Sequence, residues 1–222
     1  DTDGDGIDDV FFGSLIDWSG ARGTPDGPAD LSWTFTVPQS ARVSPIGDVN
    51  ADGLDDLAVD GQVWFGGADG PVEGPVIDPS GDLTAAGDLD GDGIDDLLAS
   101  HDSGYGGGWV KAHRGTPDGP DPVEAWTWPR LGREIQRFDV DNDGVVELLA
   151  VDSTSQHVAA SGSVVVLDGV EGDAPTVLVR GPEFSQDYAA EPNLAVLDGN
   201  GDGLPEVAFG WDGIVRELKV SG

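Results

Sequence analysis

The chain has 222 residues, with 43 acidic and only 10 basic side chains, so its formal net charge is −33. A surface this negative repels nucleic-acid phosphates and anionic lipids, which argues against partners of either kind. The absence of cysteine excludes disulfides and cysteine-based zinc or redox sites, and no apolar run is long enough to cross a bilayer. We expect one domain over residues 1–222, with no nucleic-acid partner and no membrane insertion in this segment.

Short apolar segments predict strands along the whole chain, because Asp-Gly, Gly-Gly and Pro-Asp-Gly turns separate them. No segment keeps a 3.6-residue apolar period long enough to predict a helix. Five repeats begin near residues 1, 41, 82, 134 and 193, and the complete ones contain four strands each. The expected strands are 10–13 in the first repeat, 41–46, 57–59, 62–65 and 75–77 in the second, 83–86, 97–100, 109–113 and 124–128 in the third, 135–138, 147–151, 163–167 and 176–179 in the fourth, and 214–220 in the fifth.

Four antiparallel strands per unit, repeated radially, predict an all-β fold of the β-propeller class. No strand precedes Asp1, and no outer strand follows Val220. The five repeats therefore form either a five-bladed ring that joins its two terminal strands or an arc of a six- or seven-bladed ring. The sequence begins without Met or an apolar leader, so we expect a mature or trimmed piece of the native chain.

One acidic loop accompanies each repeat, with the pattern D-x-[DN]-x-D-G-x-x-[DE], and the loops start 40 to 59 residues apart. Positions 1, 3, 5 and 9 offer side-chain oxygens, position 7 offers its carbonyl, and Gly at position 6 permits a sharp turn. An all-oxygen set suits Ca²⁺ better than Mg²⁺, and the loops contain no His or Cys for zinc or copper. The predicted ligands are Asp1, Asp3, Asp5, Ile7 and Asp9; Asp48, Asn50, Asp52, Leu54 and Asp56; Asp88, Asp90, Asp92, Ile94 and Asp96; Asp139, Asp141, Asp143, Val145 and Glu147; and Asp198, Asn200, Asp202, Leu204 and Glu206.

Position 12 separates these loops from EF-hands, which need an acid there. Here that position is apolar in every loop and belongs to the following strand: Phe12, Val59, Ala99, Ala150 and Phe209. The alternative is a set of solvated acidic turns without metal. However, so many neighbouring carboxylates repel one another, which destabilises the fold unless a cation is present. At position 8, we expect Asp8, Asp55 and Asp95 to face solvent.

The loop that leads into a strand, together with Val10-Phe-Phe-Gly13 and Trp64-Phe-Gly-Gly67, resembles the FG-GAP, or VCBS-type, repeat. That repeat is the calcium-binding blade of integrin α-subunit propellers, and it also occurs in bacterial surface proteins and some fungal lectins. The resemblance implies about five structural Ca²⁺ ions held by the predicted ligands, although Glu147 and Glu206 replace the usual Asp. It also implies a secreted or cell-surface module for binding, adhesion or surface assembly, with a protein or glycan ligand or with further copies of itself.

Two other functions remain open at this point. A lectin would hold glycans against exposed tryptophans, and Trp18 and Trp211 lie near turns, whereas Trp64 and Trp109 fall in strands and favour the core. Trp126 and Trp128 alternate and so share one face. A metal-dependent hydrolase is less favoured, because the sequence shows no recognisable Ser-His-Asp or Cys-His arrangement and no catalytic residue can be assigned.

Overall fold

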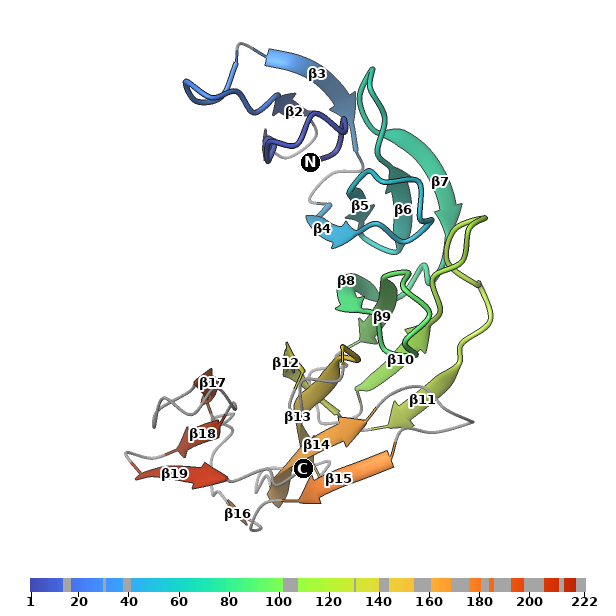
Figure 1. The fold of residues 1–222 in the computed structure, drawn as a ribbon. Coiled ribbons are helices and arrows are strands. Elements are labelled where there is room, and N and C mark those ends of the chain that lie inside the picture. The colour runs from blue at the N-terminus through green and yellow to red at the C-terminus, as the bar shows by residue number, and fades with distance from the viewer. Residues whose placement is uncertain are drawn as a thin grey trace. The chain divides into compact units, whose positions relative to one another are not determined.

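The computed structural model contains β-strands as its regular elements throughout the described part of the chain (Figure 1). The described residues are 1–13, 17–29, 31–37, 41–101, 108–129, 131–139, 144–153, 161–168, 176–180, 184–185, 193–197, 206–211 and 214–218. Among them, no helix is long and apolar enough to span a membrane. The all-β prediction is therefore confirmed for these residues.

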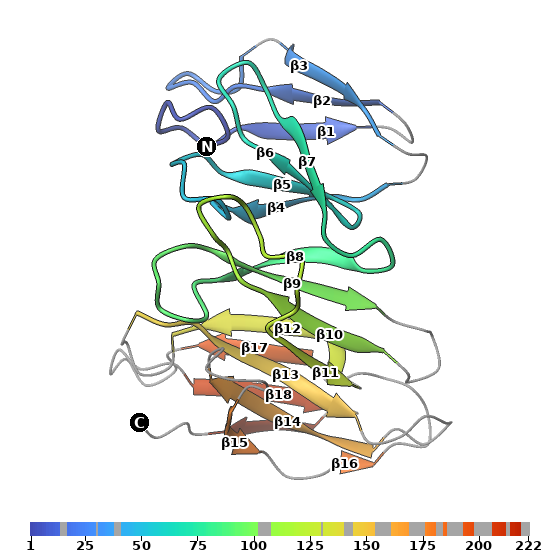
Figure 2. The same ribbon diagram turned by 90° about the vertical axis from the view of Figure 1, so that its right-hand side faces the viewer.

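The first two sheets are antiparallel meanders, in which each strand pairs with its neighbour in the chain. The first has three strands, β1 (Val10–Gly13), β2 (Asp17–Ala21) and β3 (Leu31–Thr36). The second has four, β4 (Val43–Gly47), β5 (Asp56–Val59), β6 (Gln62–Phe65) and β7 (Val72–Val76), and Figure 2 shows their order.

Three further sheets repeat this topology along the rest of the chain. The third is formed by β8 (Asp82–Gly87), β9 (Asp96–His101), β10 (Trp109–His113) and β11 (Trp126–Pro129). The fourth is formed by β12 (Leu131–Phe138), β13 (Glu147–Ser153), β14 (Ser161–Asp168) and β15 (Thr176–Arg180), with β16 (Phe184–Ser185) paired to β14. The fifth contains β17 (Asn193–Leu197), β18 (Glu206–Trp211) and β19 (Ile214–Leu218).

The acidic loop occupies the same place in every repeat. It connects the first two strands in the second to fifth sheets and directly precedes β1 in the first. The predicted strands mostly match within two residues, with two clear shifts: β7 covers Val72–Val76, whereas the sequence favoured 75–77, and β12 begins at Leu131, four residues before the predicted 135–138. β7 is largely exposed and carries no apolar period, so its sequence held little signal for its position.

The chain divides into two compact units. One comprises Asp1–Ala85, Ile94–Ala99 and His113–Val123, and the other comprises Ala86–Gly93, Ser100–Ala112 and Glu124–Gly222. The first unit holds the first two sheets together with parts of the third. The single domain over 1–222 and the closure of a ring remain predictions.

The strand that follows the acidic loop is buried in the second, third and fourth sheets, whereas β1, which follows the first loop, is largely exposed. Leu57–Val59, Leu97–Ala99 and Leu148–Ala150 are all buried, as continuous apolar runs in central strands are expected to be. In the first unit, aromatic rings add to this core: Phe35 of β3 packs on Trp64 of β6 with ring centroids 5.3 Å apart, which joins the first two sheets.

Truncation of a core leucine should test this arrangement. Leu97 is fully buried, so we expect Leu97→Ala to lower the free energy of unfolding by about 2–5 kcal/mol, as measured by chemical denaturation. Val123 is 68% exposed, and Val123→Ala should change the same quantity by less than about 0.5 kcal/mol. Equal effects of the two substitutions would contradict this assignment of the core.

Candidate metal centre

The backbone of each described acidic loop turns through glycine at position 6. The φ angles of Gly6, Gly53, Gly93 and Gly144 lie between 87° and 92°, in the left-handed region that favours glycine. Position 4 is also left-handed, with Gly4 at 79° and Gly91 at 74°, but in the second loop it is Ala51, at 56°. Ala51 therefore carries backbone strain that its counterparts avoid.

The carboxylate at position 1 organises the loop by accepting backbone hydrogen bonds. Oδ1 of Asp1 accepts from the N–H groups of Gly4 at 2.8 Å and Asp5 at 3.0 Å, and Oδ2 accepts from Gly6 at 2.8 Å. Asp88 accepts the three corresponding bonds in its own loop, and Asp48 accepts those from positions 5 and 6. A carboxylate has about four acceptor positions, so these bonds still leave capacity for a cation.

The carboxylate at position 9 closes the loop from the other side. Asp9 Oδ2 accepts from the backbone N–H and hydroxyl of Thr2, at 2.9 and 2.6 Å, and its Oδ1 accepts from Gly23 N–H at 2.9 Å. Asp56 accepts in the same way from Val49 at 3.0 Å and Gly66 at 2.8 Å. This residue thus ties position 2 of its loop to the turn after the next strand.

The third loop shows the same closure, since Asp96 accepts from Gly115 N–H at 2.7 Å. Gly23 and Gly115 belong to the segment Arg-Gly-Thr-Pro-Asp-Gly-Pro, which occurs twice, at 22–28 and 114–120. Asp56, Asp96 and Glu147 are all buried. The spacing of the motif indicates only a ligand role for position 9, because the partner in this structural role lies in another turn.

Two of the loops bring three carboxylates together. Their ligand oxygens lie within 4.8 Å of one another in the groups Asp1, Asp3 and Asp9, and Asp88, Asp90 and Asp96. These are positions 1, 3 and 9 of the predicted ligand sets. Position 5 is not part of either group. Asp5 and Asp52 instead accept from the N–H groups of Ile7 and Leu54, both at 2.9 Å.

The second loop differs because Asn50 stands at position 3. Its side-chain amide donates to Asp52 Oδ2 at 3.0 Å, and its oxygen accepts from Asp52 N–H at 3.1 Å. An amide oxygen can still bind Ca²⁺, but this loop offers one carboxylate fewer.

The last two loops are described only in part. In the fourth, Asp139 accepts from Gly144 N–H at 2.9 Å and Glu147 begins β13, whereas Asp141 and Asp143 lie outside the described residues. In the fifth, Glu206 begins β18, and the remaining predicted ligands lie outside the described residues: Asp198, Asn200, Asp202 and Leu204. The sites in these two loops therefore stay predictions, as do the carbonyl ligands of Ile94 and Val145.

A basic side chain already contacts the first group of carboxylates. Nε of Arg22 lies 2.9 Å from Asp3 Oδ2, its guanidinium carbon lies 5.3 Å from the centre of the Trp33 ring, and it also donates to the carbonyl of Ala68. The Asp3 side chain is only 3% exposed. Arg22 therefore fixes one candidate ligand and offsets part of the negative charge of the loop.

The protonation behaviour of position 9 differs between the first two loops. Burial raises the pKa of Asp56 to about 7, and hydrogen bonds from Gly66 and Val49 offset this only in part. Burial also acts to raise the pKa of Asp9, but its bonds from Thr2 and Gly23 outweigh that effect and hold the pKa below its usual value. A cation beside Asp56 would favour the charged form.

Two expectations about position 8 and the tryptophans need revision. Asp8 is exposed as expected, but Asp55 and Asp95 are half-buried and accept hydrogen bonds from the preceding loop. Trp18 lies against Gly13, and its buried indole Nε1 has no hydrogen-bond partner among the described residues, which favours packing over sugar stacking. The side chain of Trp211 lies outside the described residues.

Of the other tryptophans, Trp64 packs on Phe35 of the first sheet, whereas Trp109, Trp126 and Trp128 lie in the third sheet. Trp109 stacks on His101 with centroids 5.7 Å apart, and Lys111 Nζ lies 4.5 Å from the centre of its ring. Trp126 is buried and Trp128 half-buried, while Thr127 between them is exposed, so the two tryptophans share a face as expected. These contacts occupy rings that a lectin would need to expose.

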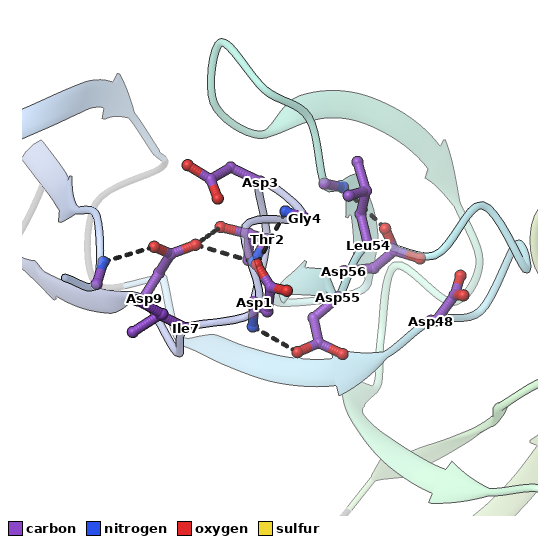
Figure 3. A network of polar contacts seen from close by, with 12 residues as sticks. Asp1, Thr2, Asp3, Gly4, Ile7, Asp9, Asp48, Leu54, Asp55 and Asp56 are labelled. Atoms are coloured by element: carbon purple, nitrogen blue, oxygen red, sulfur yellow. Dashed lines mark hydrogen bonds and ion pairs between the residues drawn. The ribbon is translucent and has the colours of Figure 1, made fainter. Parts of the chain in front are cut away.

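Figure 3 shows the hydrogen bonds between Thr2 and Asp9 in the first loop and the contact of Asp1 with Asp55 of the second. Comparison with protein-family models and with curated proteins finds no match to this chain.

The raised pKa of Asp56 predicts a pH dependence of stability in calcium-free buffer. Its pKa is about 7 when folded and 3.8 when unfolded, so between these values the folded state binds more protons than the unfolded state. Its contribution to the free energy of unfolding should therefore fall as the pH rises through this window, by up to about 1.4 kcal/mol per pH unit.

The measurement is chemical denaturation in EDTA from pH 4 to pH 8, for the native chain and Asp56→Asn. The variant should lose this part of the slope, whatever its stability at any one pH. Parallel profiles for the two proteins would show that Asp56 does not titrate in this range.

The strain at Ala51 predicts a stabilising substitution. Glycine occupies the same position in the first and third loops, so Ala51→Gly should raise the free energy of unfolding by about 0.5–1 kcal/mol. Ala85 lies inside strand β8, where Ala85→Gly should lower it by about the same amount. Destabilisation by both substitutions in chemical denaturation would rule out strain at Ala51.

Proposed function

We propose that this chain is an extracellular, calcium-stabilised β-propeller that serves as a non-enzymatic module for binding, adhesion or assembly at a cell surface. The observation that carries the proposal is the grouping of Asp1, Asp3 and Asp9 within 4.8 Å, repeated by Asp88, Asp90 and Asp96. The same positions of the same motif form both groups. Such recurrence favours a shared ligand over a chance cluster of surface acids.

The donor chemistry fits a hard divalent cation. Carboxylate oxygens at positions 1, 3 and 9 would hold the ion, and position 1 keeps an acceptor site beyond its hydrogen bonds. The ion would neutralise the negative charge of the grouped carboxylates at positions 1, 3 and 9. The chain's own part is to fix the carboxylates in advance: backbone N–H groups orient positions 1 and 9, and Arg22 orients Asp3.

The propeller architecture is supported by the regular repetition of antiparallel sheets with the acidic loop at one place in each. β-Propellers build their blades from such four-stranded meanders. The three-stranded first and last sheets are consistent either with a five-bladed ring that joins its ends or with an arc of a larger one.

The proposed location follows from calcium concentration. Loops that share their carboxylates with backbone donors and an arginine should bind Ca²⁺ weakly, in the range of extracellular modules, where dissociation constants are about 10⁻⁴–10⁻³ M. Such sites fill in the millimolar Ca²⁺ outside cells and stay empty in the cytosol. Dissociation constants below about 1 μM, measured by calorimetry, would remove this argument for an extracellular location.

Thermal unfolding tests the proposal directly. We expect the midpoint of the native chain to rise when millimolar Ca²⁺ replaces EDTA, and to rise much less with Mg²⁺, which demands a stricter geometry. At millimolar Ca²⁺, which is about one to ten times the expected dissociation constants, each site should add roughly 0.4–1.4 kcal/mol to the free energy of unfolding. An unchanged midpoint in Ca²⁺ would leave the loops as acidic turns and would contradict the proposal.

Asp90→Asn provides a matched variant. Asparagine occurs naturally at this position in the second loop, so the substitution should leave the loop folded while removing one of three grouped carboxylates. The variant should retain the midpoint of the native chain in EDTA, or exceed it through reduced repulsion, and gain less from Ca²⁺. A full calcium response in Asp90→Asn would show that the negative charge of Asp90 contributes nothing to calcium binding.

A further inference from the structure

Successive acidic loops are joined by one recurring backbone hydrogen bond. The N–H at position 8 of one loop donates to the carbonyl at position 1 of the loop before it. Asp55 donates to Asp1 at 3.0 Å, Asp95 to Asp48 at 3.3 Å, and Val146 to Asp88 at 3.0 Å. Three consecutive pairs of loops therefore share the same contact.

We call each contact between two successive loops a joint, and number the joints in chain order. In the first two joints the side chain at position 8 adds a second bond. Oδ2 of Asp95 accepts from the backbone N–H of Asp48 at 3.1 Å, and Oδ2 of Asp55 lies 2.6 Å from the amino group of Asp1 (Figure 3). The aspartate thus holds the residue at position 1 through both its backbone and its carboxylate. Valine has no acceptor, so Val146 cannot do the same for Asp88.

The site for this side chain lies beside a glycine in both the second and the third joint. Gly47 directly precedes Asp48 with φ +77°, and a Cβ at Gly47 would overlap the carboxylate of Asp95. Gly87 precedes Asp88 with φ +74°, and a Cβ placed there would lie 3.0 Å from Val146 Cγ2. The side chains of Asp95 and Val146 therefore occupy equivalent places.

We infer that Asp55 and Asp95 are clamps that hold the first three acidic loops together, and that the joint at Val146 is weaker because it lacks the carboxylate. The inference goes beyond the proposed calcium function. The clamp uses the backbone of Asp48, whose side-chain oxygens are the candidate ligands, so it acts with or without a cation. Position 8 of the fifth loop is Pro205, which has no N–H to donate and lies outside the described residues.

Variants at Asp95 test the clamp. Asp95→Val, which copies the fourth loop, should lower the thermal midpoint by about 2–4 °C and speed amide exchange in Asp48–Gly53 about five- to tenfold. Asp95→Asn keeps an oxygen acceptor and should stay close to the native chain. Asp8→Val removes an exposed aspartate from the same position of the first loop and should leave both quantities unchanged.

The reverse substitution supplies the missing group. Val146→Asp should place a carboxylate beside Gly87 and slow amide exchange in Asp88–Gly93 relative to the native chain. Both series are measured in EDTA and repeated in millimolar Ca²⁺, and we expect the same differences in both, which separates the clamp from the proposed cation. The clamp is overturned if Asp95→Val behaves like Asp8→Val, or if Asp95→Asn is as damaging as Asp95→Val. Unchanged exchange in Val146→Asp would overturn the explanation of the weak joint.

Discussion

Repulsion between carboxylates is the constraint on which this structure depends. Three acidic groups with oxygens within 4.8 Å of one another, as in Asp1, Asp3 and Asp9, strongly disfavour a compact loop unless opposite charge or hydrogen-bond donors offset them. The chain supplies backbone N–H groups to positions 1 and 9 and a guanidinium to Asp3. Fixed donors of this kind lower the repulsion without removing it, which leaves an electrostatic demand that a divalent cation would satisfy.

The acidic residues of the motif have different structural roles. Positions 1 and 9 hold the loop in shape, because position 1 accepts backbone hydrogen bonds from positions 5 and 6 and position 9 accepts one from position 2. Position 5 stabilises the last part of the turn through position 7. Position 3 accepts the N–H of position 5, and the amide oxygen of Asn50 makes the same bond, which explains why asparagine is accepted there. The same residues thus build the loop and create a site that favours a cation.

The sequence predicted those features of the fold that depend on neighbouring residues in the chain. The strands that follow the acidic loops were placed within a residue or two, since apolar runs and Asp-Gly turns are local signals. Contacts across the fold could not be predicted in this way. Asp9 meets Gly23 fourteen residues away because strands pair within the first repeat, and Asp48 meets Asp95 forty-seven residues away because two repeats pack together.

Differences between the repeats also follow from charge. Arg22, which pairs with Asp3, precedes the glycine that donates to Asp9, and Phe65 holds the corresponding place in the second repeat. There the loop has Asn50 in place of the acid, so the second repeat lacks both the arginine and the carboxylate with which it would pair. Once that pair is set aside, each of the two loops retains the same three carboxylates, at positions 1, 5 and 9. A divalent ion would therefore meet the same set of carboxylates in both, but the raised pKa of Asp56 would make binding to the second loop compete with a proton near neutral pH, whereas Asp9 in the first loop is already ionised there.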